Sequence, residues 1–244
     1  MICVVEGAVG SGKTYYCVKM VADHLRAGGV VATNLVLDKD ALRRLCHRRL
    51  SSRQFIEVDA DTDPATIPRG DLRGHGSRRV LVVLDEALNW FASSASKEDP
   101  RKASWSRWLR QSDKLGQRVV FVAQAFDRSA KWIRELSQLV VSVRNLGQLR
   151  VVGIPIGRFL GLSFLSVAVT HDLTIQQRTG TEFYTLNSDV WRCYDTAALY
   201  GFEASGNAYD RLGLWPPHPV PRLAFSLLGL WAAWGFLRLV LSRL

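Results

Sequence analysis

"VVEGAVGSGKT", residues 4–14, is the segment that best indicates the fold of this chain. An apolar run leads into it, and a segment with helical spacing follows it. It matches the pattern G-x-x-x-x-G-K-[ST] at Gly7, Gly12, Lys13 and Thr14. The order of strand, glycine-rich loop and helix is the context in which this pattern marks a phosphate-binding loop.

Such a loop binds phosphate because its backbone N–H groups point inward at the start of a helix. We expect the Lys13 ammonium to reach the β- and γ-phosphates of ATP and the Thr14 hydroxyl to bind Mg²⁺. The alternative is a glycine turn that binds nothing. The predicted nucleotide-binding residues are Gly7, Ala8, Val9, Gly10, Ser11, Gly12, Lys13, Thr14 and Tyr15.

A second motif, "VLVVLDEA" at residues 80–87, ends an apolar strand in two acids. Asp85 is expected to hold Mg²⁺ through water, and Glu86 to polarise the attacking water as a general base. An acid next to the magnesium aspartate favours hydrolysis over transfer of the phosphoryl group to a small substrate. The alternative is an acid pair that caps the following helix.

A third apolar strand, "QRVVFVAQ" at residues 117–124, ends in Gln124. Its amide is predicted to orient water near the γ-phosphate, and the alternative is a polar strand end. If the protein forms a ring, an arginine is expected to reach a neighbouring subunit's nucleotide. The candidates, each of which can equally be a solvated surface charge, are Arg110, Arg118, Arg128 and Arg134.

Buried strands alternate with helices along the chain, which predicts an α/β sheet covered on both faces. The motifs place it in the P-loop NTPase class of the ASCE type, with a mainly parallel sheet. A hairpin is expected within residues 138–154, turning near Asn145. The predicted parts are an ATPase core at 1–157, a small β-rich extension at 158–214, a proline-rich linker at 215–222 and a transmembrane helix at 223–241.

The last predicted part is the segment "LAFSLLGLWAAWGFLRLVLSRL" that begins at Leu223. It has about the length that a membrane span requires, and its apolar residues cover every face of a helix. The alternative is a helix packed on the domain. Because Met1 leads directly into a strand, no export signal is expected, and the domain before the span is placed in the cytoplasm.

The net charge indicates which classes of binding partner suit the protein, and the cysteine content indicates its compartment. The 244 residues carry a formal net charge of +10, which suits contact with nucleic acid or an anionic membrane. Four scattered cysteines predict neither a zinc site nor a disulfide framework, and they favour a reducing compartment.

The order of these motifs, with "WIREL" after them and "VWRCYDT" at residues 190–196, resembles the zonula occludens toxin-like family. This family comprises the assembly ATPases of filamentous phages. The resemblance implies an inner-membrane protein with a cytoplasmic ATPase domain. It also implies action where coat proteins replace the DNA-binding protein on phage single-stranded DNA, and in some hosts an outer-membrane channel. The exported toxin domain of many members is not expected, because Leu244 closely follows the predicted span.

The sequence therefore predicts an Mg-ATP-driven motor for assembly and export of filamentous phage, single-pass in the host inner membrane, built as a homo-oligomeric ring. One alternative is a translocation ATPase of conjugation or type IV secretion. Another is a membrane-tethered nucleotide-binding scaffold with little turnover.

Overall fold

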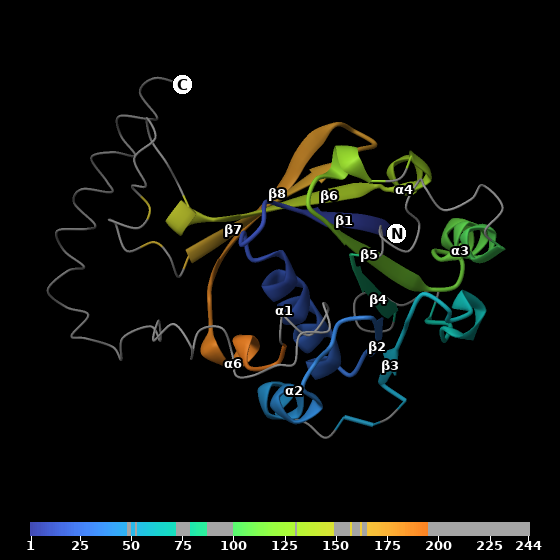
Figure 1. The fold of residues 1–244 in the computed structure, drawn as a ribbon, viewed down its shortest axis with the longest axis horizontal. Coiled ribbons are helices and arrows are strands. Elements are labelled where there is room, and N and C mark those ends of the chain that lie inside the picture. The colour runs from blue at the N-terminus through green and yellow to red at the C-terminus, as the bar shows by residue number, and fades with distance from the viewer. Residues whose placement is uncertain are drawn as a thin grey trace, which may run out of the picture. The chain divides into compact units, whose positions relative to one another are not determined.

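Eight strands form one sheet, in the order β3-β2-β4-β5-β1-β6-β7-β8, in the computed structural model (Figure 1). Neighbours from β3 to β6 pair in parallel, and β7 and β8 add two antiparallel pairs. The mainly parallel α/β sheet is therefore confirmed. The strands are β1 (Ile2–Glu6), β2 (Val30–Thr33), β3 (Phe55–Glu57), β4 (Val80–Asp85), β5 (Gln117–Ala123), β6 (Leu139–Asn145), β7 (Leu165–Asp172) and β8 (Gln177–Thr185).

The structure describes residues 1–47, 50–51, 53–71, 79–86, 100–129, 131–148, 157, 162 and 165–194. Within these ranges no helix has the length and apolar character needed to cross a membrane. The predicted linker at 215–222 and the predicted span at 223–241 lie outside the described residues.

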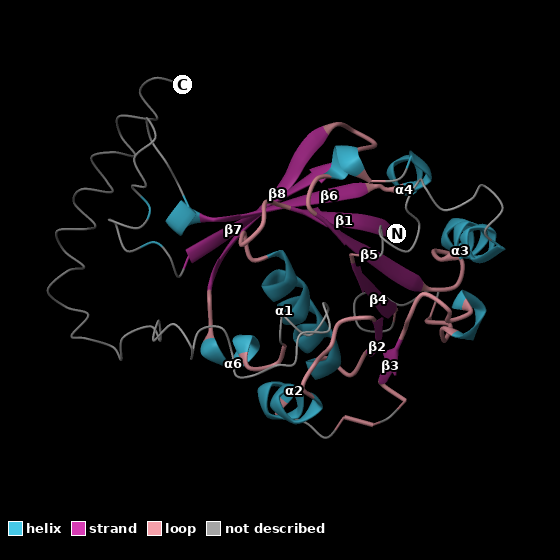
Figure 2. Cartoon of the chain, viewed as in Figure 1, coloured by secondary structure: helices cyan, strands magenta, loops and turns pink. Residues whose placement is uncertain are grey.

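Helices cover both faces of the sheet, as the sequence predicts (Figure 2). One face carries α1, α2 and α6, and the other carries α3 and α4. The helices are α1 (Lys13–Arg26), α2 (Lys39–Cys46), α3 (Pro100–Gln111), α4 (Lys131–Leu136) and α6 (Ser188–Trp191), with short 3₁₀ turns η1 (Pro64–Thr66), η4 (Phe126–Arg128) and η5 (Leu146–Gln148).

Two apolar cores lie on opposite sides of the sheet because successive strand residues point to opposite faces. In β1, Cys3 and Val5 pack toward α1, whereas Ile2 and Val4 pack toward α3 and α4. β4 is buried along its whole length, as expected for a central strand covered on both faces. The second core includes Trp105, which is 1% exposed.

The strand order brings the predicted motifs to one edge of the sheet. β5 lies between β1 and β4, and its register pairs Val122 with Asp85 and Ala123 with Glu6. The three parallel strands therefore end side by side. The glycine-rich loop after β1, the acid pair at the end of β4 and Gln124 after β5 all belong to this edge.

The prediction of a hairpin within residues 138–154 is wrong, because β6 pairs with a strand that lies later in the chain. β6 has β7 as its antiparallel neighbour, with Asn145 opposite Ser166, and residues 149–156 lie outside the described part of the chain. The stretch after Asn145 resembles a hairpin turn, but it forms η5, and the pairing strand comes about twenty residues later. Strand pairing is set by the buried sheet surface, which a local turn signal does not report.

Candidate nucleotide-binding site

The glycine-rich loop spans residues 7–12, between the end of β1 and the start of α1. Gly12 occupies the N-cap of α1 with φ 92° and ψ 19°, a left-handed conformation that favours glycine. Gly7 is required for a different reason. A Cβ there would lie 2.5 Å from the carbonyl oxygen of Val143 and 2.5 Å from the Ser11 hydroxyl. The loop therefore passes against β6 at a distance that only glycine permits.

The Lys13 ammonium is held inside the loop. Its Nζ donates to the carbonyl oxygens of Gly7 at 2.8 Å and Ala8 at 3.1 Å. Burial lowers the pKa of Lys13, while the charges of Asp85 and Glu86 oppose that shift. A charged amine in a half-buried loop is suited to bind phosphate oxygens.

Thr14 and Asp85 meet across the site. The Thr14 hydroxyl donates to Oδ2 of Asp85 at 3.1 Å, and Asp85 is 5% exposed. Burial raises the pKa of Asp85 to about 6; the charge of Glu86 adds to the shift, whereas Thr14 and Lys13 oppose it. A buried carboxylate beside a lysine and a hydroxyl offers the oxygen donors that Mg²⁺ prefers.

Asn34 holds the main chain of Asp85. The sequence motifs did not predict this role of Asn34. Its side-chain Oδ1 accepts from the Asp85 N–H at 2.7 Å, and its Nδ2 donates to the Asp85 carbonyl at 2.6 Å. Asn34 directly follows β2, which pairs with β4. A polar residue directly after a buried strand is the signal that could have found it.

Glu86 directly follows β4 and has φ 51°, which is uncommon for a residue other than glycine. Such strained positions concentrate at functional sites. Gln124 directly follows β5 and is exposed on the same edge of the sheet. The structure thus brings both residues to the loop's edge, and their catalytic roles stay predictions.

Glu6, the last residue of β1, is a second residue that the motifs did not predict. Its Oε2 accepts from the Phe126 N–H at 2.8 Å, and its Oε1 accepts from the Ser142 hydroxyl at 2.7 Å. Phe126 lies just beyond Gln124, and Ser142 lies in β6. Glu6 therefore connects the strand before the loop to the segments on either side.

The four candidate finger arginines lie in different places. Arg110, in the last turn of α3, and Arg134, in α4, are exposed. Arg128 belongs to η4, on the loop's edge of the sheet. Arg118 is second in β5, at the opposite edge, and lines a groove of about 700 Å³ beside α1. All four roles stay predictions.

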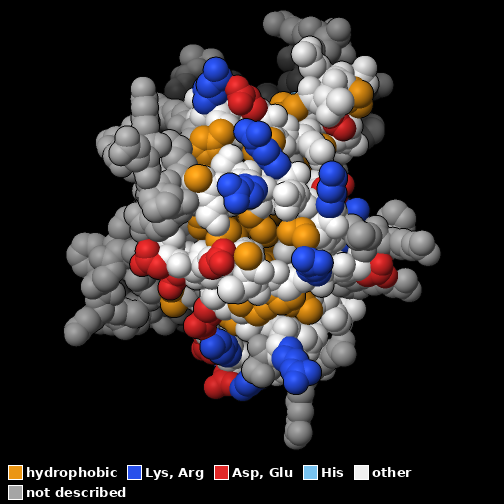
Figure 3. All heavy atoms as spheres, turned by 90° about the vertical axis from the view of Figure 1, so that its right-hand side faces the viewer, with side chains coloured by type: hydrophobic (Ala, Val, Ile, Leu, Met, Phe, Trp, Pro, Cys, Tyr) orange, Lys and Arg blue, Asp and Glu red, His pale blue; other side chains and the backbone are white. Residues whose placement is uncertain are grey.

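The side of the molecule where the N-terminus lies carries charges of both signs around hydrophobic side chains (Figure 3). Oδ1 of Asp113 lies 3.0 Å from the Met1 amine and 2.7 Å from a guanidinium nitrogen of Arg79. Asp113 therefore pairs with two cations on this side of the molecule.

The residues fit a nucleoside triphosphate with a divalent cation. The Ser11 hydroxyl is buried and has no hydrogen-bond partner among the residues that the structure describes, as expected of a loop whose polar groups serve a ligand. Lys13 supplies a cation for phosphate, and Thr14 and Asp85 supply oxygen ligands for Mg²⁺. The arrangement can therefore hold ATP and Mg²⁺.

Relatives cover most of this chain. The Gene 1 protein of Enterobacteria phage I2-2 is 29% identical over 209 residues, which are 82% of this chain and 57% of that protein. The Gene 1 protein of Enterobacteria phage M13 is 27% identical over 219 residues, 85% of this chain and 62% of that protein. The chain thus spans less than two thirds of the length of these curated relatives.

Two solved structures align with low scores. The N-terminal domain of zonular occludens toxin from Neisseria meningitidis aligns over 80% of this chain and 98% of that chain, with 16% identity and a TM-score of 0.45. The DNA-packaging ATPase B204 from Sulfolobus Turreted Icosahedral Virus aligns over 76% and 97%, with 13% identity and a TM-score of 0.44. The family model described as Zonular occludens toxin (Zot) matches residues 1–198. The chain therefore belongs to the zonular occludens toxin family.

Proposed function

We propose that the chain is an Mg²⁺-dependent ATPase that drives assembly and export of filamentous phage. The observation that carries the ATPase proposal is the meeting of Thr14, Asp85 and Lys13 at one edge of the sheet. Bound Mg²⁺ would supply charge neutralisation at the phosphates. The contact between the Thr14 hydroxyl and Asp85, with the Lys13 ammonium near that carboxylate, supports this proposal.

Each residue has a stated task in this proposal. The loop N–H groups and Lys13 bind and orient the phosphates, and Thr14 and Asp85 hold Mg²⁺. Glu86 accepts a proton from the attacking water, and Gln124 orients that water. Asn34 fixes the main chain of Asp85 through two hydrogen bonds and so keeps the carboxylate aimed at Thr14.

The motor role rests on the family and on the phage origin of the Gene 1 relatives. We propose a homo-oligomeric ring in the host inner membrane, anchored by the predicted span at 223–241 with its ATPase domain in the cytoplasm. Its proposed partners are the phage coat proteins and the complex of phage single-stranded DNA, and in some hosts an outer-membrane channel. The net charge of +10 supports contact with nucleic acid or an anionic bilayer.

ATP turnover by the purified full chain tests the catalytic half of the proposal. Lys13→Ala should abolish nucleotide binding, whereas Glu86→Gln should keep binding and lose about 100-fold or more in turnover. Glu135→Gln, which changes an exposed acid in α4, is the matched control and should behave as wild type. Full turnover by Glu86→Gln would contradict hydrolysis at this site, and binding without turnover in the wild type would favour the tethered scaffold.

Particle release tests the motor half. Cells producing phage are supplied with the wild-type chain, Lys13→Ala, Glu86→Gln or Glu135→Gln, and particles in the medium are counted. We expect release with the wild type and the control alone. Normal release with stable, membrane-inserted Lys13→Ala or Glu86→Gln would rule out the motor.

A further inference from the structure

A tyrosine ties the first turn of α1 to the corner between β8 and α6. Tyr15 directly follows Lys13 and Thr14 and is 1% exposed. Its hydroxyl donates to the Thr185 carbonyl oxygen at 3.2 Å and accepts from the Asn187 N–H at 2.7 Å. One hydroxyl therefore bridges the last residue of β8 and the N-cap of α6.

Aromatic rings fill the space between the loop and this corner. The Tyr15 ring stacks on Tyr184 with centroids 5.9 Å apart and planes 4° from parallel, and it tilts against Trp191 at 5.4 Å. The Tyr184 hydroxyl oxygen lies 3.9 Å from the point where a Cβ on Gly12 would sit. Close-packed rings transmit small displacements because they leave no free volume in which a shift can be absorbed.

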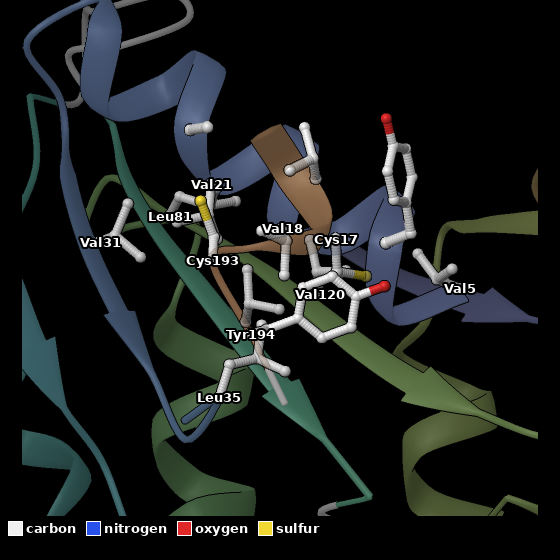
Figure 4. Packing of buried hydrophobic residues seen from close by; sticks show 14 of the residues in the cluster. Val5, Cys17, Val18, Val21, Val31, Leu35, Leu81, Val120, Cys193 and Tyr194 are labelled. Carbon is white, nitrogen blue, oxygen red and sulfur yellow. The ribbon is translucent and has the colours of Figure 1, made fainter. Parts of the chain in front are cut away.

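The corner leads to the last described residues, which are buried beside α1 and α2. The Cys193 carbonyl accepts from the Asp38 N–H at 2.8 Å, and Tyr194 forms a β-bridge with Leu37. Figure 4 shows Cys193 and Tyr194 among apolar side chains of α1 and the segment after β2, with Val18 next to them. Cys193 and Tyr194 are therefore held by elements that pack in the same apolar core as α1.

Nucleotide binding would replace contacts that the first turn of α1 makes. The Lys13 ammonium bonds to the carbonyls of Gly7 and Ala8, and the Thr14 hydroxyl bonds to Asp85. Phosphate oxygens and Mg²⁺ compete for these same groups. Any shift that follows reaches Tyr15 next, because Tyr15 is the following residue of the helix.

We propose that Tyr15 is a positioning residue that transmits nucleotide occupancy from the loop to the corner between β8 and α6. The inference rests on the nucleotide-binding part of the proposed function and requires no hydrolysis. It assigns the segment 187–194 as a part of the domain that responds to nucleotide.

Hydrogen exchange of the full chain, with and without Mg²⁺ and a non-hydrolysable ATP analogue, tests this proposal. In the wild type, exchange of the amides in residues 187–194 should change at least about threefold on binding. Tyr15→Phe keeps the main-chain N–H of residue 15 and, measured at saturating analogue, should lose most of that change. The matched control is Tyr16→Phe, since the Tyr16 hydroxyl makes no hydrogen bond among the described residues. It should respond as the wild type does.

Three outcomes overturn the proposal. The first is an unchanged response in Tyr15→Phe, and the second is faster exchange with and without analogue at a constant ratio, which marks a purely structural role. The third is a wild type that binds the analogue without any change at 187–194 relative to β2, and this arm needs no variant to fold. Absence of binding in the wild type instead overturns the proposed function as well, and Lys13→Ala provides the reference for that result.

Discussion

The Thr14 hydroxyl lies 3.1 Å from a carboxylate oxygen of Asp85, although 71 residues separate them in the sequence. The contact joins the first turn of α1 to the end of β4, and β5 lies between β4 and β1, the strand that leads into the loop. It is the point where the two motifs become one site, and the first two predictions follow from it.

Thr14→Ala removes the hydroxyl and leaves the loop glycines in place. In the wild type we expect Mg²⁺ to raise the affinity for a fluorescent ATP analogue. In Thr14→Ala this gain in affinity should be smaller by a factor of at least about ten. Thr14→Ser keeps the hydroxyl and should stay within about threefold of the wild type. Titrations in Mg²⁺ and in EDTA measure this, and an alanine variant with normal Mg²⁺ dependence would contradict the assignment of Thr14.

Asp85 should destabilise the nucleotide-free protein at neutral pH. Burial raises its folded-state pKa to about 6 from 3.8, so its contribution to stability is full below pH 4 and is lost as pH rises through 6. Asp85→Asn removes this cost, which is about 3 kcal/mol at pH 8. Thermal unfolding should give a higher Tm for the variant at pH 8 and equal values near pH 4, while the variant loses Mg-ATP binding.

Asp113→Asn is the control, because it should change the stability at pH 8 in the opposite direction. Hydrogen bonds from the Met1 amine and Arg79 lower the pKa of Asp113. Its contribution is therefore present above the unfolded pKa and is lost as pH falls, so the variant should be less stable than the wild type at pH 8. An Asp85→Asn variant that is also less stable at pH 8 would show that burial does not dominate at that site.

Gly7→Ala should be more damaging than its small size suggests. The added Cβ would meet the Val143 carbonyl oxygen at 2.5 Å, and backbone cannot turn aside as a flexible side chain can. We expect a loss of about 1–3 kcal/mol in the free energy of unfolding, with weaker nucleotide binding. Gly180→Ala, where the nearest atom is 3.8 Å away, should change stability by less than about 0.5 kcal/mol. Denaturant unfolding compares the two, and equal losses would contradict the crowding at Gly7.

Glu6→Ala should weaken the link between the loop and its neighbouring strands. It leaves the partly buried N–H of Phe126 without its acceptor, at a cost of about 1–3 kcal/mol. Glu6→Gln keeps one acceptor oxygen, and the Ser142 hydroxyl can turn to accept from the amide, so it should cost less than about 1 kcal/mol. Urea unfolding gives the free energy of unfolding of both variants. An alanine variant as stable as the glutamine variant would contradict the proposed role of Glu6.

Local pattern was enough for the parts of the site that are contiguous in the chain. Gly7, Gly12, Lys13 and Thr14 lie within one loop and one helix turn, so their spacing alone predicts how they are arranged. The Val-rich runs likewise predict buried parallel strands, and β4 and β5 are buried as expected. Pattern failed at the hairpin after β6, because the pairing partner of a strand is chosen by distant residues.

The phosphate loop, the acid pair and the α/β class could be predicted from the sequence, because each depends on residues close together in the chain. The folded structure was needed to show that Asn34 holds Asp85, that Glu6 contacts Phe126 and Ser142, and that Tyr15 bridges Thr185 and Asn187. Those contacts depend on strand order, and strand order follows from burial of the whole sheet. Apolar segments with similar sequences do not specify which strand each of them will pair with.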